Sequence, residues 1–238
     1  MTIPSPQYLM TMPLHAITEV YGEEGLRQRF AAQISQLPAP ARQTLDEALV
    51  LASDLHRDDR RVREPYVNHL LRTTIRIVCY YHVTDVDVLT AALLHDAIED
   101  HPAELAGTPG GTGLDARDVV ARLFNPRVAE LVWAVTNPDY DPQREEHQQY
   151  RDHVTESLET NPWARVIKVS DFTDNGVGLV HTTGPKLSRL AAKYRPLVPI
   201  LQALVARPDT PLADTVKQHI QGQLNLAETR FRAILQNT

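Results

Sequence analysis

The stretch Leu89-Thr90-Ala91-Ala92-Leu93-Leu94-His95-Asp96-Ala97-Ile98-Glu99-Asp100 joins an apolar run to one histidine and three carboxylates. The aliphatic run predicts a helix. If that helix continues, a turn of about 3.6 residues places Glu99 above His95 and Asp100 above Asp96. Such groups at the end of an apolar helix cost free energy unless they face water, find partners or hold a cation. We favour a cation.

Apolar residues recur at helical spacing on both sides of this stretch, and no β alternation of useful length and no internal repeat is visible. The expected helices cover about residues 15–37, 41–56, 65–82, 145–159, 186–205 and 212–235. A chain of 238 residues can form one large domain. We therefore predict an all-α, single-domain helical bundle over residues 14–238, preceded by a flexible lead at residues 1–13.

Composition excludes several classes of protein. A net charge of -6 argues against general affinity for nucleic acid. The one cysteine, Cys79, excludes a disulfide framework within the chain. Neither an apolar run of the roughly 18 to 20 residues needed to cross a bilayer nor a signal peptide is present. We expect a cytoplasmic protein with no membrane partner, and its oligomeric state stays open.

Glycine and proline gather at residues 103–114, directly after the opening stretch. This composition predicts a mobile loop. The loop is either a lid over the neighbouring polar groups or a surface connector.

Metal-ligand residue types occur in three separated places on mostly apolar elements. They are His69, the pair His95-Asp96, and Asp171 at the end of an apolar segment. Two imidazoles and two carboxylates suit a transition ion such as manganese, iron or zinc better than magnesium or calcium. Because the set contains no thiolate, a structural zinc cage is not expected.

The motifs resemble those of the HD superfamily of metal-dependent phosphohydrolases. More specifically, three stretches look like the hydrolase domain of RelA/SpoT-type proteins: Glu64-Pro65-Tyr66-Val67-Asn68-His69, His95-Asp96-Ala97-Ile98-Glu99-Asp100 and Asp171-Phe172-Thr173-Asp174-Asn175. The resemblance covers roughly residues 45–205. It implies an HD-type helical bundle and a small, hydrolase-only protein.

That family removes the 3′-pyrophosphate from the alarmones guanosine tetra- and pentaphosphate, using a manganese ion to activate water. The resemblance implies that the substrate is a phosphorylated nucleotide of this kind and that the ion is Mn²⁺, with Fe²⁺, Zn²⁺ or Co²⁺ as alternatives. It also implies roles for individual residues: His69, His95, Asp96 and Asp171 would hold the metal, Glu99 and Asp100 would orient or deprotonate the water, and Arg60, Arg61 and Asn175 would contact the nucleotide.

One segment departs from the family pattern. The chain has Phe172-Thr173-Asp174 where the family carries Arg-Leu-His, so a cation and an imidazole are missing. Two alternatives therefore stay open: hydrolysis of another nucleotide, such as a deoxynucleotide or NADPH, and a non-catalytic module that binds an alarmone or a partner protein. Lys168 either pairs with a neighbouring carboxylate or takes part in the site. The remaining histidines, including His56 and His101, are expected at the surface.

Overall fold

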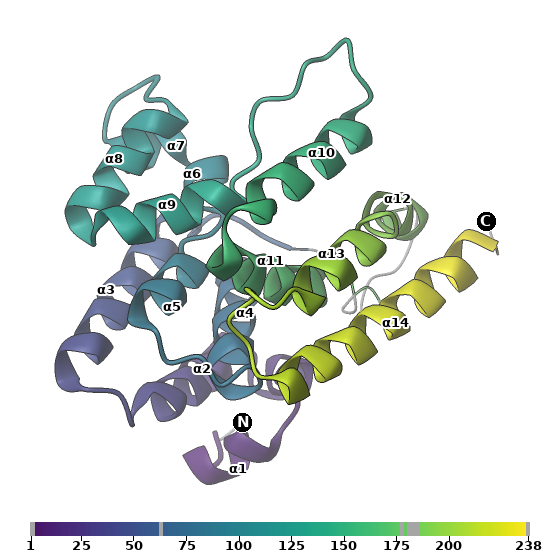
Figure 1. Ribbon diagram of the computed structural model, residues 1–238. Coiled ribbons are helices and arrows are strands. Elements are labelled where there is room, and N and C mark those ends of the chain that lie inside the picture. The colour runs from purple at the N-terminus through teal and green to yellow at the C-terminus, as the bar shows by residue number, and fades with distance from the viewer. Residues whose placement is uncertain (1–2, 62–63, 177–178, 180–185, 237–238) are drawn as a thin grey trace. The chain divides into compact units, whose positions relative to one another are not determined.

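The computed structural model describes residues 3–61, 64–176, 179 and 186–236 (Figure 1). All regular elements in these residues are helices, and the only β pairing among them is an isolated bridge between Arg60 and Pro65. The all-α prediction is confirmed. The chain divides into two compact units, Met1–Trp133 and Ala134–Thr238. The single domain expected over residues 14–238 stays a prediction, and each unit is described by itself.

The first unit contains the motifs around His69 and His95. Its helices are α1 (Pro6–Thr11), α2 (Leu14–Ile34), α3 (Ala39–Leu55), α4 (Val67–Cys79), α5 (Val86–Leu93), α6 (Ala97–Asp100), α7 (Pro102–Ala106), α8 (Gly113–Leu123) and α9 (Pro126–Val135), the last of which continues past the boundary between the units. Helix α5 packs against both α3 and α4, and α4 also packs against α2 (Figure 1).

Helix α4 is buried along nearly its whole length, including its polar residues. Buried Arg72 forms two hydrogen bonds of 2.7 Å with the Glu64 carboxylate, one from each terminal nitrogen. Asn68 also donates to Glu64. A buried guanidinium is tolerated when its charge and its donors are paired in this way. The segment before α4 is therefore held against the helix by its own acidic residue.

The helix that leads into the opening stretch does not continue through it. Asp85 caps α5 by accepting from the backbone of Asp87 and Val88, as its position before the apolar run suggests. The helix ends at Leu93, and His95 and Asp96 lie in a turn before α6 begins. The expectation of one continuous helix was wrong, although Asp100 does follow Asp96 by one turn, since its backbone amide donates to the Asp96 carbonyl oxygen. His95 and Asp96 in this turn are hydrogen-bonded to the Ala92 carbonyl oxygen and to the Tyr66 hydroxyl group, respectively.

Two stretches expected to be flexible contain helices. Within the lead, α1 buries Leu9, whose carbonyl oxygen accepts a hydrogen bond from buried Arg29. Most of α7 lies within residues 103–114, and the helix ends before Gly107, which has a left-handed backbone conformation. Thr112 forms a capping box with Asp115 at the start of α8. The lead and the 103–114 stretch are therefore partly helical, and their predicted flexibility stays a prediction. The lid stays an untested interpretation.

The second unit contains α10 (Glu146–Glu159), α11 (Pro162–Asn175), α12 (Lys186–Tyr194), α13 (Leu197–Ala206) and α14 (Asp214–Gln236). The helix expected over 186–205 is two helices, because Pro196 precedes α13 and cannot continue the hydrogen-bonding pattern of α12. Helix α14 packs against α11, α12 and α13. Phe231 of α14 is fully buried.

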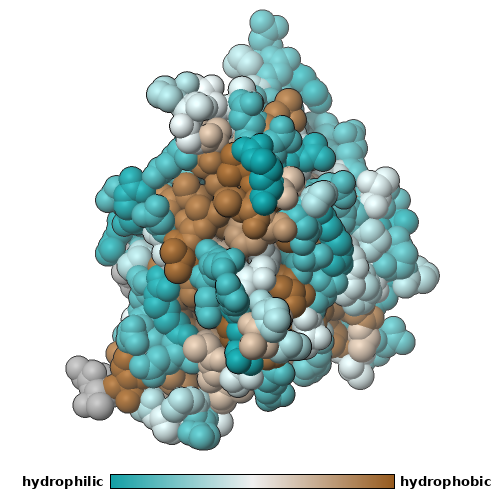
Figure 2. Space-filling model, turned by 90° about the vertical axis from the view of Figure 1, so that its left-hand side faces the viewer, coloured by the Kyte–Doolittle hydropathy of each residue, from teal (hydrophilic) through white to brown (hydrophobic). Residues whose placement is uncertain are grey.

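Hydrophilic residues cover much of the face shown in Figure 2, although apolar residues also reach that surface. Val50, Leu114 and Leu123 are among the exposed large apolar residues of the described chain. Single residues of this kind are ordinary on a protein surface. Within the described residues, every helix is too short or too polar to span a bilayer.

Candidate metal centre

Three predicted ligands meet in the first unit. His69 lies near the start of α4, and His95 and Asp96 form the turn between α5 and α6. The two Nε2 atoms are 3.2 Å apart, and Oδ2 of Asp96 lies 3.0 Å from Nε2 of His95 and 3.7 Å from Nε2 of His69. Both imidazoles are buried, whereas the Asp96 side chain is partly exposed. These atoms could hold one metal ion.

The backbone decides which nitrogen of His95 carries a proton. Its Nδ1 lies 2.8 Å from the carbonyl oxygen of Ala92, which can only accept a hydrogen bond. We therefore assign the proton of the neutral ring to Nδ1, and the lone pair of Nε2 faces Asp96 and His69. Such a hydrogen bond to the second nitrogen is the usual way in which proteins orient a metal-binding histidine.

One cation could contact all three of these atoms at once. A proton on Nε2 of His69 could be shared with only one neighbouring acceptor at a time. Metal bonds of about 2.1 Å imply donor separations of about 3.0 Å in an octahedron and about 3.4 Å in a tetrahedron. The separations of 3.0 and 3.2 Å match that spacing, and 3.7 Å is slightly wider.

Tyr66 contacts the candidate ligands and was not singled out by the sequence. Its hydroxyl group donates to Oδ2 of Asp96 at 2.8 Å, and its ring packs edge to face with His69. Burial and the negative charge of Asp96 raise the pKa of Tyr66, so the hydroxyl group keeps its proton. Tyr66 therefore orients the Asp96 carboxylate. The motif Glu64-Pro65-Tyr66 contained this signal, but only as part of a resemblance.

The predicted catalytic carboxylates follow on α6. Glu99 and Asp100 are both exposed. The pKa of Asp100 is raised to about 7, first by partial desolvation of its carboxyl group and then by the negative charges of Asp96 and Glu99. A carboxylate with a pKa near neutrality can accept and return a proton at physiological pH.

The predicted phosphate-binding arginines lie just before α4. Arg60 is exposed, and the guanidinium of Arg61 lies 5.8 Å from the centre of the Tyr66 ring. Tyr66 therefore contacts both Arg61 and Asp96. Arg63, another arginine of this segment, lies outside the described residues.

Asp171 and Asn175 lie on α11 in the second unit, so their meeting with the imidazoles stays a prediction. The buried Asp171 carboxylate is 3.1 Å from the ammonium of Lys168, and Asn175 donates to its other oxygen. The pairing of Lys168 with a neighbouring carboxylate, one of two predicted alternatives, is present. Asn175 thus contacts Asp171, and its contact with the nucleotide stays a prediction.

The residues that depart from the family pattern, Phe172-Thr173-Asp174, also lie on α11. Phe172 is buried and packs edge to face with Tyr194 and Phe231. Thr173 donates its hydroxyl proton to the carbonyl oxygen of Val169. Phe172 thus contributes to the core of the second unit, at a position where the resembled family carries a cation.

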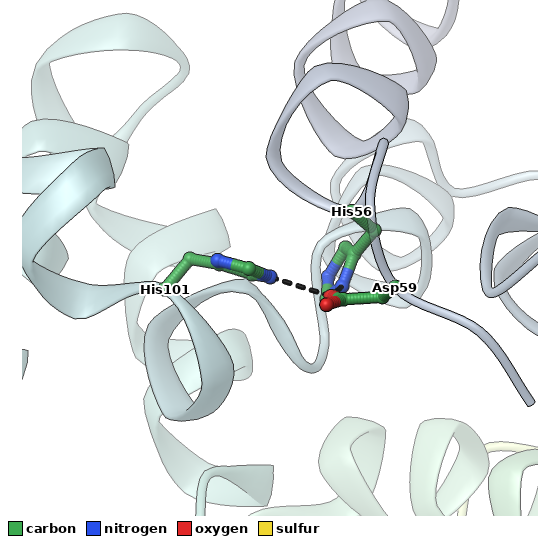
Figure 3. A group of neighbouring side chains, drawn as sticks. All are labelled: His56, Asp59 and His101. Atoms are coloured by element: carbon green, nitrogen blue, oxygen red, sulfur yellow. Dashed lines mark hydrogen bonds and ion pairs between the residues drawn. The ribbon is translucent and has the colours of Figure 1, made fainter.

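A second cluster was missed because His56 and His101 were expected at the surface. His56 is only 3% exposed, and His101 is partly buried. Figure 3 shows both rings directed at the Asp59 carboxylate. Nδ1 of His56 and Nε2 of His101 lie 2.7 and 2.6 Å from the same atom, Oδ2 of Asp59. The surface prediction was wrong for His56, whereas His101 is partly exposed.

Comparison with known proteins identifies relatives for part of the chain. No protein-family model matches. The chain is 33% identical to guanosine-3′,5′-bis(diphosphate) 3′-pyrophosphohydrolase MESH1 of Drosophila melanogaster, over 54% of this chain and 65% of that protein. It is 31% identical to the protein of the same name from Homo sapiens, over 52% of this chain and 63% of the relative. The chain thus spans slightly less than two thirds of the length of these curated relatives.

A solved structure extends the similarity. It is described as "A metazoan ortholog of SpoT hydrolyzes ppGpp and plays a role in starvation responses". The match has a TM-score of 0.56 and 27% identity, and it covers 77% of this chain and 96% of that one. The resemblance predicted from the motifs is therefore confirmed by sequence and by fold.

Proposed function

We propose that this chain, a relative of the HD-type pyrophosphohydrolases, hydrolyses guanosine tetra- and pentaphosphate to release the 3′-pyrophosphate. The observation that carries the proposal is the convergence of His69, His95 and Asp96, with the His95 lone pair directed at the other two groups. The names of the relatives supply the substrate class.

We further propose that these three residues hold one divalent ion together with Asp171. A set of imidazole and carboxylate donors without sulfur favours Mn²⁺, with Fe²⁺, Zn²⁺ and Co²⁺ as alternatives. An ion there would polarise a phosphate oxygen and lower the pKa of water. Lys168 pairs with Asp171, and since each carboxylate oxygen has two lone pairs, Asp171 could bind the ion without losing this partner.

The remaining residues would handle charge and protons. Asp100, with its pKa near 7, would take the proton of the attacking water, and Glu99 would help to orient that water. Arg60 and Arg61 would bind substrate phosphates, since guanidinium groups pair well with phosphate oxygens. Asn175 would keep Asp171 oriented or contact the nucleoside. The reaction adds water across the phosphorus–oxygen bond and yields guanosine di- or triphosphate and pyrophosphate.

The test uses the purified full chain with guanosine tetraphosphate and each of the four ions. The expected result is release of pyrophosphate and guanosine diphosphate in equal amounts. His95→Ala should abolish release, whereas His219→Ala, at an exposed histidine of the second unit, should not. Absence of pyrophosphate with every ion would reject the proposed activity.

The buried Phe172 supports a second candidate, hydrolysis of a different nucleotide. Because this side chain packs in the core, the position offers no cation to a substrate. The same assay should therefore include deoxynucleoside triphosphates and NADPH. A higher kcat/KM for one of these than for guanosine tetraphosphate would select the second candidate. Tight binding of guanosine tetraphosphate without turnover would instead indicate a non-catalytic module.

A further inference from the structure

We propose that His56, Asp59 and His101 form a second metal site, which takes a divalent transition ion of the zinc class. The proposal does not depend on the hydrolytic function, because it concerns a separate set of side chains. One potential ligand atom from each residue lies within 4.8 Å of the other two. Two imidazoles and one carboxylate form a donor set that suits zinc, iron, cobalt or nickel.

Backbone contacts fix the positions of the three residues. His56 follows the last residue of α3 as its C-cap, and the backbone amide of Asp59 donates back to the His56 carbonyl oxygen in a tight turn. The carbonyl oxygen of Asp59 in turn accepts from the backbone amide of Tyr66. His101 occupies the junction between α6 and α7. The ligands therefore come from two places in the chain, and each place is held by backbone hydrogen bonds.

An outer partner supports His101. While Nε2 of His101 faces Asp59, its Nδ1 lies 3.7 Å from the carboxylate of Glu104. Glu104 is itself paired with Arg57 at 2.6 Å. At 3.7 Å this contact is longer than a hydrogen bond, so Glu104 acts on the His101 ring through its negative charge.

Metal binding by His56 requires the neutral form of its ring, with no proton on Nδ1. Among the described residues, nothing hydrogen-bonds to its Nε2. The neutral ring can therefore move its proton from Nδ1 to Nε2 without breaking another hydrogen bond, and Nδ1 is then a ligand.

The present spacing is that of hydrogen bonds, and an ion would widen it. The separations of 2.6 and 2.7 Å are shorter than donor separations around a metal, which are about 3.0 to 3.4 Å for bonds of about 2.1 Å. The Asp59 side chain is 35% exposed, whereas that of His56 is 1% exposed. Rotation of the aspartate toward solvent can supply the extra half ångström and leaves a coordination position open to water.

The experiment measures zinc bound to the purified full chain by equilibrium dialysis and elemental analysis. To remove the first centre, it is done in a His95→Ala background, where we expect one zinc ion per chain. Adding His101→Gln should abolish this binding, and adding His219→Gln should leave it unchanged. Cobalt provides a second probe, since its visible absorption bands should appear in the His95→Ala protein and disappear with His101→Gln.

Asp59→Asn serves as the second variant in case His101→Gln impairs folding, which circular dichroism would reveal. It keeps the size of the side chain but removes the charge, and zinc affinity should fall at least tenfold. No zinc binding by the folded His95→Ala protein would overturn the proposal, and so would zinc binding that survives both substitutions. Loss of alarmone hydrolysis has no bearing on this outcome, so the two proposals can fail separately.

Discussion

Two clusters in the first unit use the same residue types but differ in spacing and burial. In the cluster of His69, His95 and Asp96, acceptor atoms face one another at 3.0 to 3.7 Å. In the second cluster, two imidazoles contact one carboxylate oxygen at hydrogen-bond length. In the first cluster the three atoms face one another at separations typical of metal ligands, whereas in the second both imidazoles hydrogen-bond to one carboxylate oxygen. Residue type alone therefore does not distinguish a strong site from a weaker one.

Loss of a ligand from the first cluster should have the largest effect. Because removing an outer partner of a metal ligand already costs about 10- to 100-fold in metal affinity, His95→Ala should cost more than 100-fold in Mn²⁺ affinity and abolish hydrolysis. Titration calorimetry and a pyrophosphate assay would measure both. If His95→Ala binds Mn²⁺ as the wild-type protein does, the first cluster is not the tighter site.

The next effect should come from Asp100, beside the first cluster. Asp100→Asn keeps the size of the side chain but cannot accept the proton, so kcat should fall about 10²- to 10⁴-fold. In the wild-type protein, activity should rise with pH up to about 7, because the carboxylate must be deprotonated. A bound cation would move this rise to lower pH. Unchanged kcat in Asp100→Asn would exclude the role of Asp100 as the base.

Sequence reasoning recovered the first cluster and missed the second for a physical reason. His69 and His95 lie within or beside apolar runs, so their polarity stands out against the pattern. His56 and His101 lie at helix ends among charged residues, where a histidine is unremarkable. Their burial depends on contacts between segments 42 residues apart, such as the bond from His101 to Asp59.

The fold shows the same limit on a smaller scale. Apolar periodicity located most of the helices, but it did not detect the break after Leu93 that turns His95 and Asp96 out of α5. Two hydrogen bonds accompany that break, one from His95 to the Ala92 carbonyl oxygen and one from Tyr66 to Asp96. The second of these joins residues 30 positions apart, which local propensity does not register.

Tyr66 offers a sharper test because it touches both clusters. Its ring stacks on His56 at 4.7 Å between centroids, and its hydroxyl group binds Asp96. Tyr66→Phe keeps the stacking but removes the hydrogen bond. Mn²⁺ affinity of the first cluster should therefore fall about 10- to 100-fold. Zinc binding by the second cluster, measured in the His95→Ala background, should not change. An equal loss at both clusters would show that Tyr66 supports the local fold rather than Asp96 alone.

The smallest effect concerns the stability of the metal-free protein. The pKa of Asp100 in the folded chain, about 7, lies above its ordinary value of 3.8, so the folded state favours the protonated form. The folded state therefore loses stability relative to the unfolded state as pH rises from about 4 to about 7. Asp100→Asn removes this loss, so its stabilising effect should be larger at pH 8 than at pH 5. Because Asp100 is exposed, screening by water should limit the gain to about 1 kcal/mol.

Urea unfolding of both proteins at the two pH values, with a chelator present, would measure that gain. The His56, Asp59 and His101 cluster should respond in the opposite direction, because its histidines hold the pKa of Asp59 below the usual value. Asp59→Asn should therefore destabilise the protein at pH 8, where the wild-type carboxylate is charged and paired. If both substitutions stabilised the protein at pH 8, or both destabilised it, the result would contradict the opposite pKa shifts of Asp100 and Asp59.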